Sequence, residues 1–394
     1  MSIDSDSSST QTTASSPTVL LLAPYYPPAY RGGGPIRTTS AITSTYAYRI
    51  RFMVVSSDTD WGERKPLAIE SDTWVDRSES RVWYVKGNSL RSLRRALRSA
   101  KASTPDIVYA NSFFNPRYSI LPVLLTRFGH FGGARVIVAP RGEFGAAARH
   151  YKSRKKNIFV QVARMSGLYR HVIWHASSDD EANDVRRAFP QSRIVVRPNE
   201  SALPWQALRS DTLPNDTVRL IFISRISEIK GVTILLAALQ DIDYSVRLDI
   251  YGSAHDPAYL ARCEAIASDL PANVEVIFHG STDNSQVRPL FSTADAFFLP
   301  TEQENFGHAI AESLSAGCPV FVADVTPWTD VIHSGGGTVV RSCDVADWHR
   351  ALKEYCATEP HERHAMKIAA AEAYEAWRAE QEGPSIFDLV LPLH

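Results

Sequence analysis

Two glutamates stand eight positions apart in the stretch TEQENFGHAIAESLSAGCPV, residues 301–320. The apolar run DAFFLP before this stretch predicts a strand, and the residues after it predict a helix. Glu304 would lie in the loop at the strand end, where its carboxylate could bind sugar hydroxyls, and Glu312 would lie in the helix, where it could bind both hydroxyls of a ribose. The alternative for Glu304 is a first-turn charge favoured by the helix dipole, and the alternative for Glu312 is an exposed helix position.

The start of this helix is a candidate phosphate site. We expect the helix to begin near Asn305 or Phe306, and the first amides of a helix have no acceptor within it. The amides of Phe306, Gly307 and His308 would then point at a bound anion. Gly307 lets the backbone come close to a ligand. A core or surface histidine is the plain alternative for His308.

Two cations follow another predicted strand in LIFISRISEIKG, residues 220–231. Ligands of open α/β sheets bind outside the carboxyl ends of the strands, which is where Arg225 and Lys230 would lie. The planar fork of Arg225 and the compact charge of Lys230 could together hold a diphosphate. A solvated loop with ordinary surface cations is the alternative.

The stretch YRGGGPIRTT places Gly32, Gly33 and Gly34 before a predicted helix. Such a loop can wrap a phosphate or an acceptor, although three glycines are also common in loops without a ligand. The G-x-G-x-x-G spacing of a dinucleotide site is absent, which argues against a hydride-transfer enzyme.

The elements that must position these residues alternate strand and helix in two halves. A chain of 394 residues is long enough for two domains, and βα alternation predicts parallel, doubly wound sheets. We therefore expect an α/β protein with two Rossmann-like domains that face a cleft. The expected segments are a disordered tail at 1–17, the first domain at 18–200, the second domain at 216–370, and a C-terminal helix and tail at 371–394 that could cross back to the first domain.

Composition narrows the classes of function. The formal net charge of −1 gives no support for nucleic acid binding. The four cysteines form no C-x-x-C pair, which argues against a disulfide framework or a zinc site. The tail lacks a signal-peptide pattern and no apolar run reaches 18 residues, so we expect a cytoplasmic protein. Peripheral contact with the inner face of a membrane is the second expectation.

Together these segments resemble the retaining glycosyltransferases of family GT4, the glycosyl transferases of group 1, which have the GT-B fold. The resemblance rests on SRISEIKG, on the two glutamates of ENFGHAIAE, on SAGCPV and on the GGGP loop. The motifs PRGEF and TPW look like a branch of the family that builds surface polysaccharides. The resemblance covers nearly the whole chain after residue 17.

The resemblance implies a role for each motif. Arg225 and Lys230 would neutralise the departing diphosphate without a metal ion or another cofactor. The acceptor would attack on the face that the diphosphate leaves, and a phosphate oxygen would take its proton. The anomeric configuration would then be retained.

The same resemblance implies a donor site. Glu304 would bind the donor sugar and Glu312 the ribose, while the backbone from Asn305 to His308 would lie near the sugar and the phosphates. The loop Gly32–Gly34 would close over the donor from the first domain.

One departure concerns the acceptor. Many relatives have a histidine in the segment that here reads APRGEF, where this chain has Arg141 and Glu143. Arg141 could bind an anionic acceptor or a phosphate, and we include Glu143 with it as an acceptor-binding candidate. An ion pair between the two is the structural alternative.

Two basic stretches, 91–101 and 149–171, allow three interpretations: solvated helix faces, contact with anionic lipid, or nucleic acid, which we do not expect as a partner. The predicted function is transfer of a hexose-type sugar from a nucleotide diphosphate to a saccharide or lipid-linked acceptor. A nucleotide-sugar epimerase of the same fold and a non-catalytic nucleotide-sugar-binding relative are the alternatives.

Overall fold

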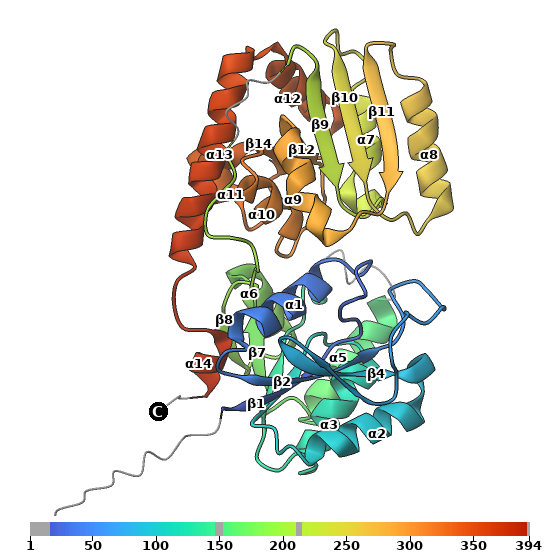
Figure 1. The fold of residues 1–394 in the computed structure, drawn as a ribbon, viewed down its shortest axis with the longest axis vertical. Coiled ribbons are helices and arrows are strands. Elements are labelled where there is room, and N and C mark those ends of the chain that lie inside the picture. The colour runs from blue at the N-terminus through green and yellow to red at the C-terminus, as the bar shows by residue number, and fades with distance from the viewer. Residues whose placement is uncertain (1–15, 146–152, 210–214, 392–394) are drawn as a thin grey trace, which may run out of the picture.

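The structure is a computed structural model that describes residues 16–145, 153–209 and 215–391. It contains two α/β domains, each built on one sheet packed between helices, and Figure 1 shows the N-terminal domain below the C-terminal domain. The predicted fold class is confirmed. The division at 18–200 and 216–370 stays a prediction. Residues 1–15 of the predicted N-terminal tail, 149–152 of the second basic stretch and 392–394 of the predicted C-terminal tail lie outside the described residues.

The N-terminal sheet has eight strands in the order β3-β4-β2-β1-β5-β6-β7-β8, all parallel except β3, which is antiparallel to β4. The first strand, TVLLL, is buried along its whole length, which is typical of a parallel strand covered on both faces. The strands are β1 (Thr18–Leu22), β2 (Arg51–Ser57), β3 (Trp74–Arg77), β4 (Ser80–Val85), β5 (Ile107–Ala110), β6 (Arg135–Val138), β7 (Ile173–Ala176) and β8 (Arg193–Val196).

Local sequence explains where two helices of this domain begin. The first helix starts after Gly33 and has Pro35 in its first turn, where a missing amide hydrogen costs nothing. The helix after β7 is capped by the Ser178 side chain, which accepts from the Glu181 amide. The helices are α1 (Gly34–Tyr46), α2 (Leu90–Lys101), α3 (Leu121–Arg127), α5 (Ser153–Met165) and α6 (Asp179–Ala188).

The C-terminal sheet has six parallel strands in the order β11-β10-β9-β12-β13-β14. The strands are β9 (Val218–Ile223), β10 (Val246–Tyr251), β11 (Val274–Gly280), β12 (Ala296–Leu299), β13 (Val320–Ala323) and β14 (Gly337–Val340). The helices that connect them are α7 (Val232–Ala238), α8 (Pro257–Ser268), α9 (Asn284–Thr293), α10 (His308–Ser315) and α11 (Thr329–Val331), and α12 (Val345–Ala357) follows the last strand.

The strand orders set the position of the candidate site. In the C-terminal sheet the chain order reverses at β9, which has β10 on one side and β12 on the other. In the N-terminal sheet it reverses at β1, between β2 and β5. Crevices at such reversals, outside the carboxyl ends of the strands, are the usual ligand sites of this architecture. The loops that follow β9 and β12 carry Arg225, Lys230 and Glu304.

The C-terminal segment crosses back to the first domain. The long helix α13 (Pro360–Glu380) packs its Ala370, Tyr374 and Trp377 into the core of the second domain, so the boundary that we placed at 370/371 falls inside this helix. The short helix α14 (Ile386–Val390) inserts three apolar side chains into the core of the first domain, as Figure 1 shows at the lower left. Within the described residues, no helix combines the length and the apolar composition that crossing a bilayer requires.

Candidate functional site

Lys230 and Glu304 form a largely buried ion pair between the loops after β9 and β12, with 2.7 Å between Nζ and Oε2. Lys230 also donates to the Gln303 carbonyl at 3.3 Å. The two loops can approach because the next residue is Gly231, whose φ is 70° and where a Cβ atom would lie 2.1 Å from the Pro300 carbonyl oxygen. The structure thus joins two of the predicted site residues directly.

The helix α10 begins at His308, later than the predicted start near Asn305 or Phe306. Gly307 occupies the N-cap with a left-handed φ of 82°, and Asn305 and Phe306 before it lie in a bend outside the helix. Within the described chain, the amides of Phe306, Gly307 and His308 donate to no protein acceptor. The donors predicted for a bound anion are therefore available, although Phe306 lies in the loop and Gly307 at the N-cap, before the helix itself.

His308 is held by the first domain. Its Nε2 atom lies 2.9 Å from Oγ1 of Thr38 on α1. The close approach needs a small residue at position 34, because a Cβ atom on Gly34 would lie 3.1 Å from the His308 ring. Burial, together with the nearby Arg37 and Arg141, lowers the pKa of His308 to about 3. The imidazole is consequently neutral at physiological pH.

Glu312 lies inside the protein, where its side chain faces Arg37 of α1. The two side chains form an ion pair, and Arg37 also donates from Nε to Asn284 at 3.1 Å. Burial raises the pKa of Glu312, while the positive charge of Arg37 opposes the rise. The alternative of an exposed helix position is therefore wrong, because only 9% of Glu312 is exposed.

Arg225 is exposed and lies against an aromatic residue of the other domain. Its guanidinium carbon is 5.5 Å from the centroid of the Trp61 ring. Trp61 in turn contacts His255 edge-on, with 3.9 Å between the ring centroids. The structure thus brings Lys230 to Glu304 but places Arg225 beside Trp61, and a diphosphate site shared by Arg225 and Lys230 stays a prediction.

The glycine loop, residues 32–34, lies between the Trp61–Arg225 contact and the start of α10. A Cβ atom on Gly32 would lie 3.6 Å from Cβ of Trp61, and Gly34 faces His308. A Cβ atom on Gly33 would meet no other atom within 4 Å, so the surroundings of this glycine are open. The loop Gly32–Gly34 therefore borders the Arg225 contact on one side and the start of α10 on the other, and closure over a donor stays a prediction.

Arg141 forms a hydrogen-bond network inside the N-terminal domain. Its Nε donates to Asn111 at 2.7 Å, its Nη2 to the Tyr109 hydroxyl at 2.7 Å, and its Nη1 to Asn199. The Tyr109 hydroxyl also lies 2.7 Å from Nδ1 of His175. The structural alternative, an ion pair between Arg141 and Glu143, is not formed in the described chain.

Glu143 is partly buried, and its carboxylate is hydrogen-bonded within its own domain. It accepts from the Ser112 hydroxyl at 2.9 Å and from the amides of Phe113 and Phe114 at 2.7 and 2.9 Å. Burial raises the pKa of Glu143 despite these hydrogen bonds. These contacts give acceptor binding by its carboxylate no support, and the acceptor roles of Arg141 and Glu143 stay predictions.

The loop around Arg141 nevertheless reaches the second domain. A Cβ atom on Gly142 would lie 3.0 Å from Cβ of Asn305, and the Asn305 side-chain amide donates to the Ser177 hydroxyl at 3.2 Å. Ser177 is fixed by the buried carboxylate of Glu181, which accepts from its amide and hydroxyl at 2.7 Å. Asn305 therefore lies against the N-terminal domain beside the candidate donor site.

Sequence reasoning missed several residues that border the cleft: Arg37, Thr38, Trp61, Ser177, Glu181 and His255. A signal existed for Arg37 and Thr38, which directly follow the GGGPI run in the first helix. Trp61 and His255 lie in loops without a motif. Within the described ranges, no three His, Cys, Asp or Glu side chains gather as a metal site would require.

The sequence is similar to those of known glycosyltransferases. Residues 206–373 match the family model described as "Glycosyl transferases group 1". The chain is 29% identical to a D-inositol 3-phosphate glycosyltransferase of Xylanimonas cellulosilytica over 50% of this chain and 51% of that protein. It is 28% identical to a GDP-mannose:cellobiosyl-diphosphopolyprenol alpha-mannosyltransferase of Xanthomonas oryzae pv. oryzae over 62% of this chain and 65% of that one. The chain thus spans between about half and two thirds of the length of these relatives.

Solved structures share the fold over nearly the whole chain. The sucrose-phosphate synthase of Thermosynechococcus elongatus superposes with a TM-score of 0.71 at 17% identity, covering 93% of this chain and 96% of that one. The Anabaena HepE protein in complex with UDP and glucose gives 0.68 at 15% identity, covering 92% and 95%. WaaG, a glycosyltransferase involved in lipopolysaccharide biosynthesis, gives 0.55 at 15% identity, covering 94% and 97%. The predicted GT-B fold is confirmed.

Proposed function

We propose that this chain, whose residues 206–373 match the family model of the glycosyl transferases of group 1, transfers a hexose-type sugar from a nucleotide diphosphate to an acceptor with retention of the anomeric configuration. The observation that carries the proposal is the Lys230–Glu304 pair, which lies beside the unengaged amides of Phe306, Gly307 and His308. A cation, a carboxylate and free backbone donors are the groups that a sugar diphosphate requires.

Lys230 and Arg225 stabilise the diphosphate as the glycosidic bond breaks. Negative charge builds on the leaving oxygen at that point, and fixed cations in a cleft stabilise such charge without a metal ion. The acceptor hydroxyl attacks on the face that the diphosphate leaves. The new bond joins the acceptor oxygen to the anomeric carbon, the bond to the diphosphate breaks, and a phosphate oxygen takes the acceptor proton.

Glu304 binds the hydroxyls of the donor sugar. Its pairing with Lys230 fixes the carboxylate next to the phosphate site, so that sugar and phosphate are held together. Asn305 and the backbone up to His308 line the same side of the donor. The loop Gly32–Gly34 covers it from the first domain.

Glu312 binds the ribose hydroxyls of the donor. Because its carboxylate faces Arg37, donor binding must share or displace that ion pair. The exchange keeps the buried carboxylate partnered in both states, which avoids the cost of an unpaired buried charge.

The donor and acceptor classes follow from the relatives. One names GDP-mannose and a diphosphopolyprenol acceptor, and a solved neighbour contains UDP and glucose. We therefore propose a nucleotide-diphosphate hexose as donor and a saccharide or lipid-linked saccharide as acceptor. Arg141 is proposed to contact the acceptor from the first domain, and Glu143 to hold the same loop. A cytoplasmic location, contact with the inner face of a membrane and the lack of a nucleic acid partner stay predictions.

A screen of melting temperature against UDP-, GDP-, ADP- and dTDP-hexoses tests the donor, because a ligand of the native state raises it by mass action. The best donor is then incubated with saccharide and lipid-linked acceptors, and the anomeric configuration of the product is read by NMR. A product with the donor's configuration supports the proposal. Conversion of the donor without any acceptor would indicate an epimerase, and binding without turnover a non-catalytic relative.

A further inference from the structure

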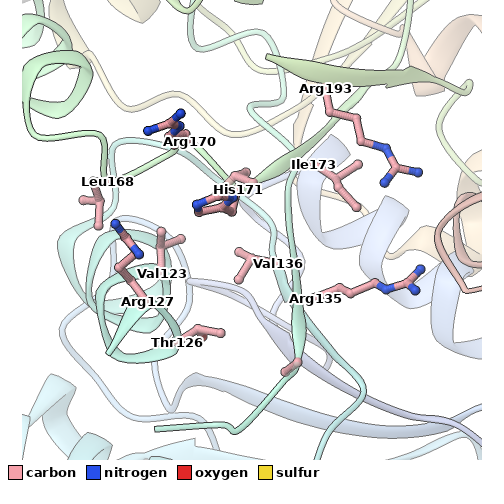
Figure 2. Close-up of a pocket in the computed structure, with 12 residues that line it drawn as sticks. Val123, Thr126, Arg127, Arg135, Val136, Leu168, Arg170, His171, Ile173 and Arg193 are labelled. Carbon is pink, nitrogen blue, oxygen red and sulfur yellow. The ribbon is translucent and has the colours of Figure 1, made fainter. Parts of the chain in front are cut away.

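The N-terminal domain contains a cavity of about 610 Å³ at the amino ends of β6, β7 and β8. Helix α3 forms one wall, and the turn between α5 and β7 forms another (Figure 2). The carboxyl ends of the same strands face the cleft, so this cavity lies at the opposite edge of the sheet from the candidate donor site. Its volume falls in the range of about 300–1,000 Å³ that is typical of ligand pockets.

Four arginines and a histidine line this cavity: Arg127, Arg135, Arg170, His171 and Arg193. Figure 2 shows His171 between Arg127 and Arg170 on one side and Arg135 and Arg193 on the other. None of the lining residues is acidic. Among the residues that the structure describes, none of these five side chains forms an ion pair or a hydrogen bond. The four guanidinium charges are therefore available to an outside ligand.

The floor of the cavity is apolar. Val123, Val136, Leu168 and Ile173 contribute side chains beneath the cations. A cationic rim over an apolar floor fits a ligand with an anionic group and an organic body, because no acidic side chain lines the cavity to pair with the arginines.

Helix dipoles explain only part of the arrangement. Arg127 is the last residue of α3, where a cation is favoured without any ligand. Arg135 and Arg193 are the first residues of β6 and β8, and Arg170 lies in a turn before β7. No helix end accounts for these three, although they meet at one cavity.

We propose that this cavity is a second ligand site, distinct from the donor cleft, that binds a phosphate-bearing anion. Guanidinium groups present paired donors that match phosphate oxygens, and several of them around one cavity select for multiple negative charge. The apolar floor accepts the body of the ligand. The phosphate is carried either by a soluble compound or by a lipid headgroup at a membrane surface.

The test measures binding of inorganic tripolyphosphate to the full-length protein by calorimetry at 0.15 M salt, where weak surface attraction is screened. The double variant R135Q/R193Q removes two rim charges and leaves the apolar floor. We expect its affinity for tripolyphosphate to fall at least about tenfold, which corresponds to about 1.4 kcal/mol. A second arm measures sedimentation with phosphatidylcholine vesicles, with and without phosphatidic acid.

Two controls make the outcome specific. The variant R91Q/R94Q removes two exposed charges from α2, and R225Q removes a cleft cation that could also attract the probe. Loss of tripolyphosphate binding in R135Q/R193Q alone assigns the site to a soluble anion. Loss confined to vesicles with phosphatidic acid assigns it to a headgroup. Equal binding by R135Q/R193Q and the wild type in both arms, or an equal loss in R91Q/R94Q, overturns the proposal.

Discussion

Arg37 of α1 and Glu312 of α10 form an ion pair that joins the two domains across the candidate cleft. Thr38, the next residue along α1, contacts His308 on the same helix α10. One turn of α1 therefore holds two residues of the predicted donor site. The carboxylate predicted to bind ribose is paired with the first domain, and a donor must compete with Arg37 for it.

Stability should depend on pH through this pair. The pKa of Glu312 is raised in the folded protein, so between its unfolded and folded values the folded state binds the extra proton and the free energy of unfolding falls as pH rises. In E312Q the free energy of unfolding should no longer fall with pH over this range. In R37Q the fall should extend to higher pH, and the free energy of unfolding should be lower by about 2 kcal/mol near neutral pH, because the variant leaves a buried carboxylate unpaired. Chemical denaturation from pH 5 to 8 measures both.

The control for this prediction is R31Q, which breaks the more exposed pair between Arg31 and Glu63. Exposed pairs contribute little, so R31Q should follow the wild-type curve. A curve for R37Q that coincides with that of R31Q would contradict the prediction.

Glu304 should be needed for transfer. Replacing it with glutamine removes the partner of Lys230 and one charged acceptor for sugar hydroxyls, so E304Q should lower kcat/KM by about 10- to 100-fold. Steady-state kinetics with the best donor measures the loss. The matched control is E302Q in the same loop, whose side chain is exposed. Near-wild-type turnover in folded E304Q would remove the role assigned to this residue.

Trp61 should affect donor binding through Arg225. W61A removes the ring beneath the guanidinium, and the loss of an exposed cation–π contact predicts a rise of about two- to fivefold in the donor KM. Trp205, in the segment between β8 and β9, makes the same kind of contact with Arg378 at 4.6 Å, outside the cleft. W205A should leave the donor KM unchanged, and equal effects in both variants would argue for a general loss of stability.

Transfer should survive removal of divalent metals. The cations assigned to the leaving diphosphate are Arg225 and Lys230, so a metal ion is not required for that role. We expect the rate with excess EDTA to stay within about twofold of the untreated rate, since a positioned metal contributes far more than that to phosphate chemistry. Full loss of activity in EDTA, restored by Mg²⁺, would contradict the assignment.

The C-terminal helix α14 should stabilise the first domain in a pH-dependent way. Arg49 binds Asp388 through two contacts of 2.5 and 2.9 Å and lowers the pKa of Asp388 to about 2. D388N should cost about 2 kcal/mol at pH 7, a typical value for hydrogen bonds to a charged group. Because the folded pKa is depressed, this stabilisation is lost as pH falls from about 4 towards 2, so the gap to the wild type should narrow there.

The control for D388N is E380Q, which neutralises an exposed carboxylate at the end of α13. Melting temperatures at pH 7 and pH 3 measure both variants. If the difference in melting temperature between D388N and the wild type grows on acidification, the contact with Arg49 is not the cause of that difference.

Strands that are buried on both faces could be predicted from the sequence. TVLLLAP, DIVYANS, DAFFLP and PVFVADV each contain a strand, and each is a short apolar run bounded by polar or turn residues, which is the pattern that predicts a buried strand. The pair β3 and β4 could not be predicted in the same way. Trp74–Arg77 is partly exposed, and the connection through Ser78 and Glu79 lacks the glycine or asparagine typical of a tight hairpin.

Site residues within one motif could be predicted, and contacts between motifs could not. SRISEIKG and ENFGHAIAE place Lys230 and Glu304 after neighbouring strands, where the ion pair forms. The partners of Glu312 and Arg225 come from the other domain, and local periodicity carries no information about how two domains face each other. Arg141 illustrates the same limit, since its three acceptors lie 30 to 58 residues away in the chain.

The chain passes between its two domains twice, once after β8 and again after α13, on the same side of the molecule (Figure 1). The outgoing segment runs along the returning helix, since Pro204 accepts from Tyr374 at 2.6 Å and Ser201 from Arg378 at 3.1 Å. Two adjacent tethers restrict sliding and separation more than they restrict swinging about their common line. The two domains should therefore open by a hinge motion about the two adjacent crossing segments, after β8 and after α13, and the donor should enter from the side of the cleft opposite to them.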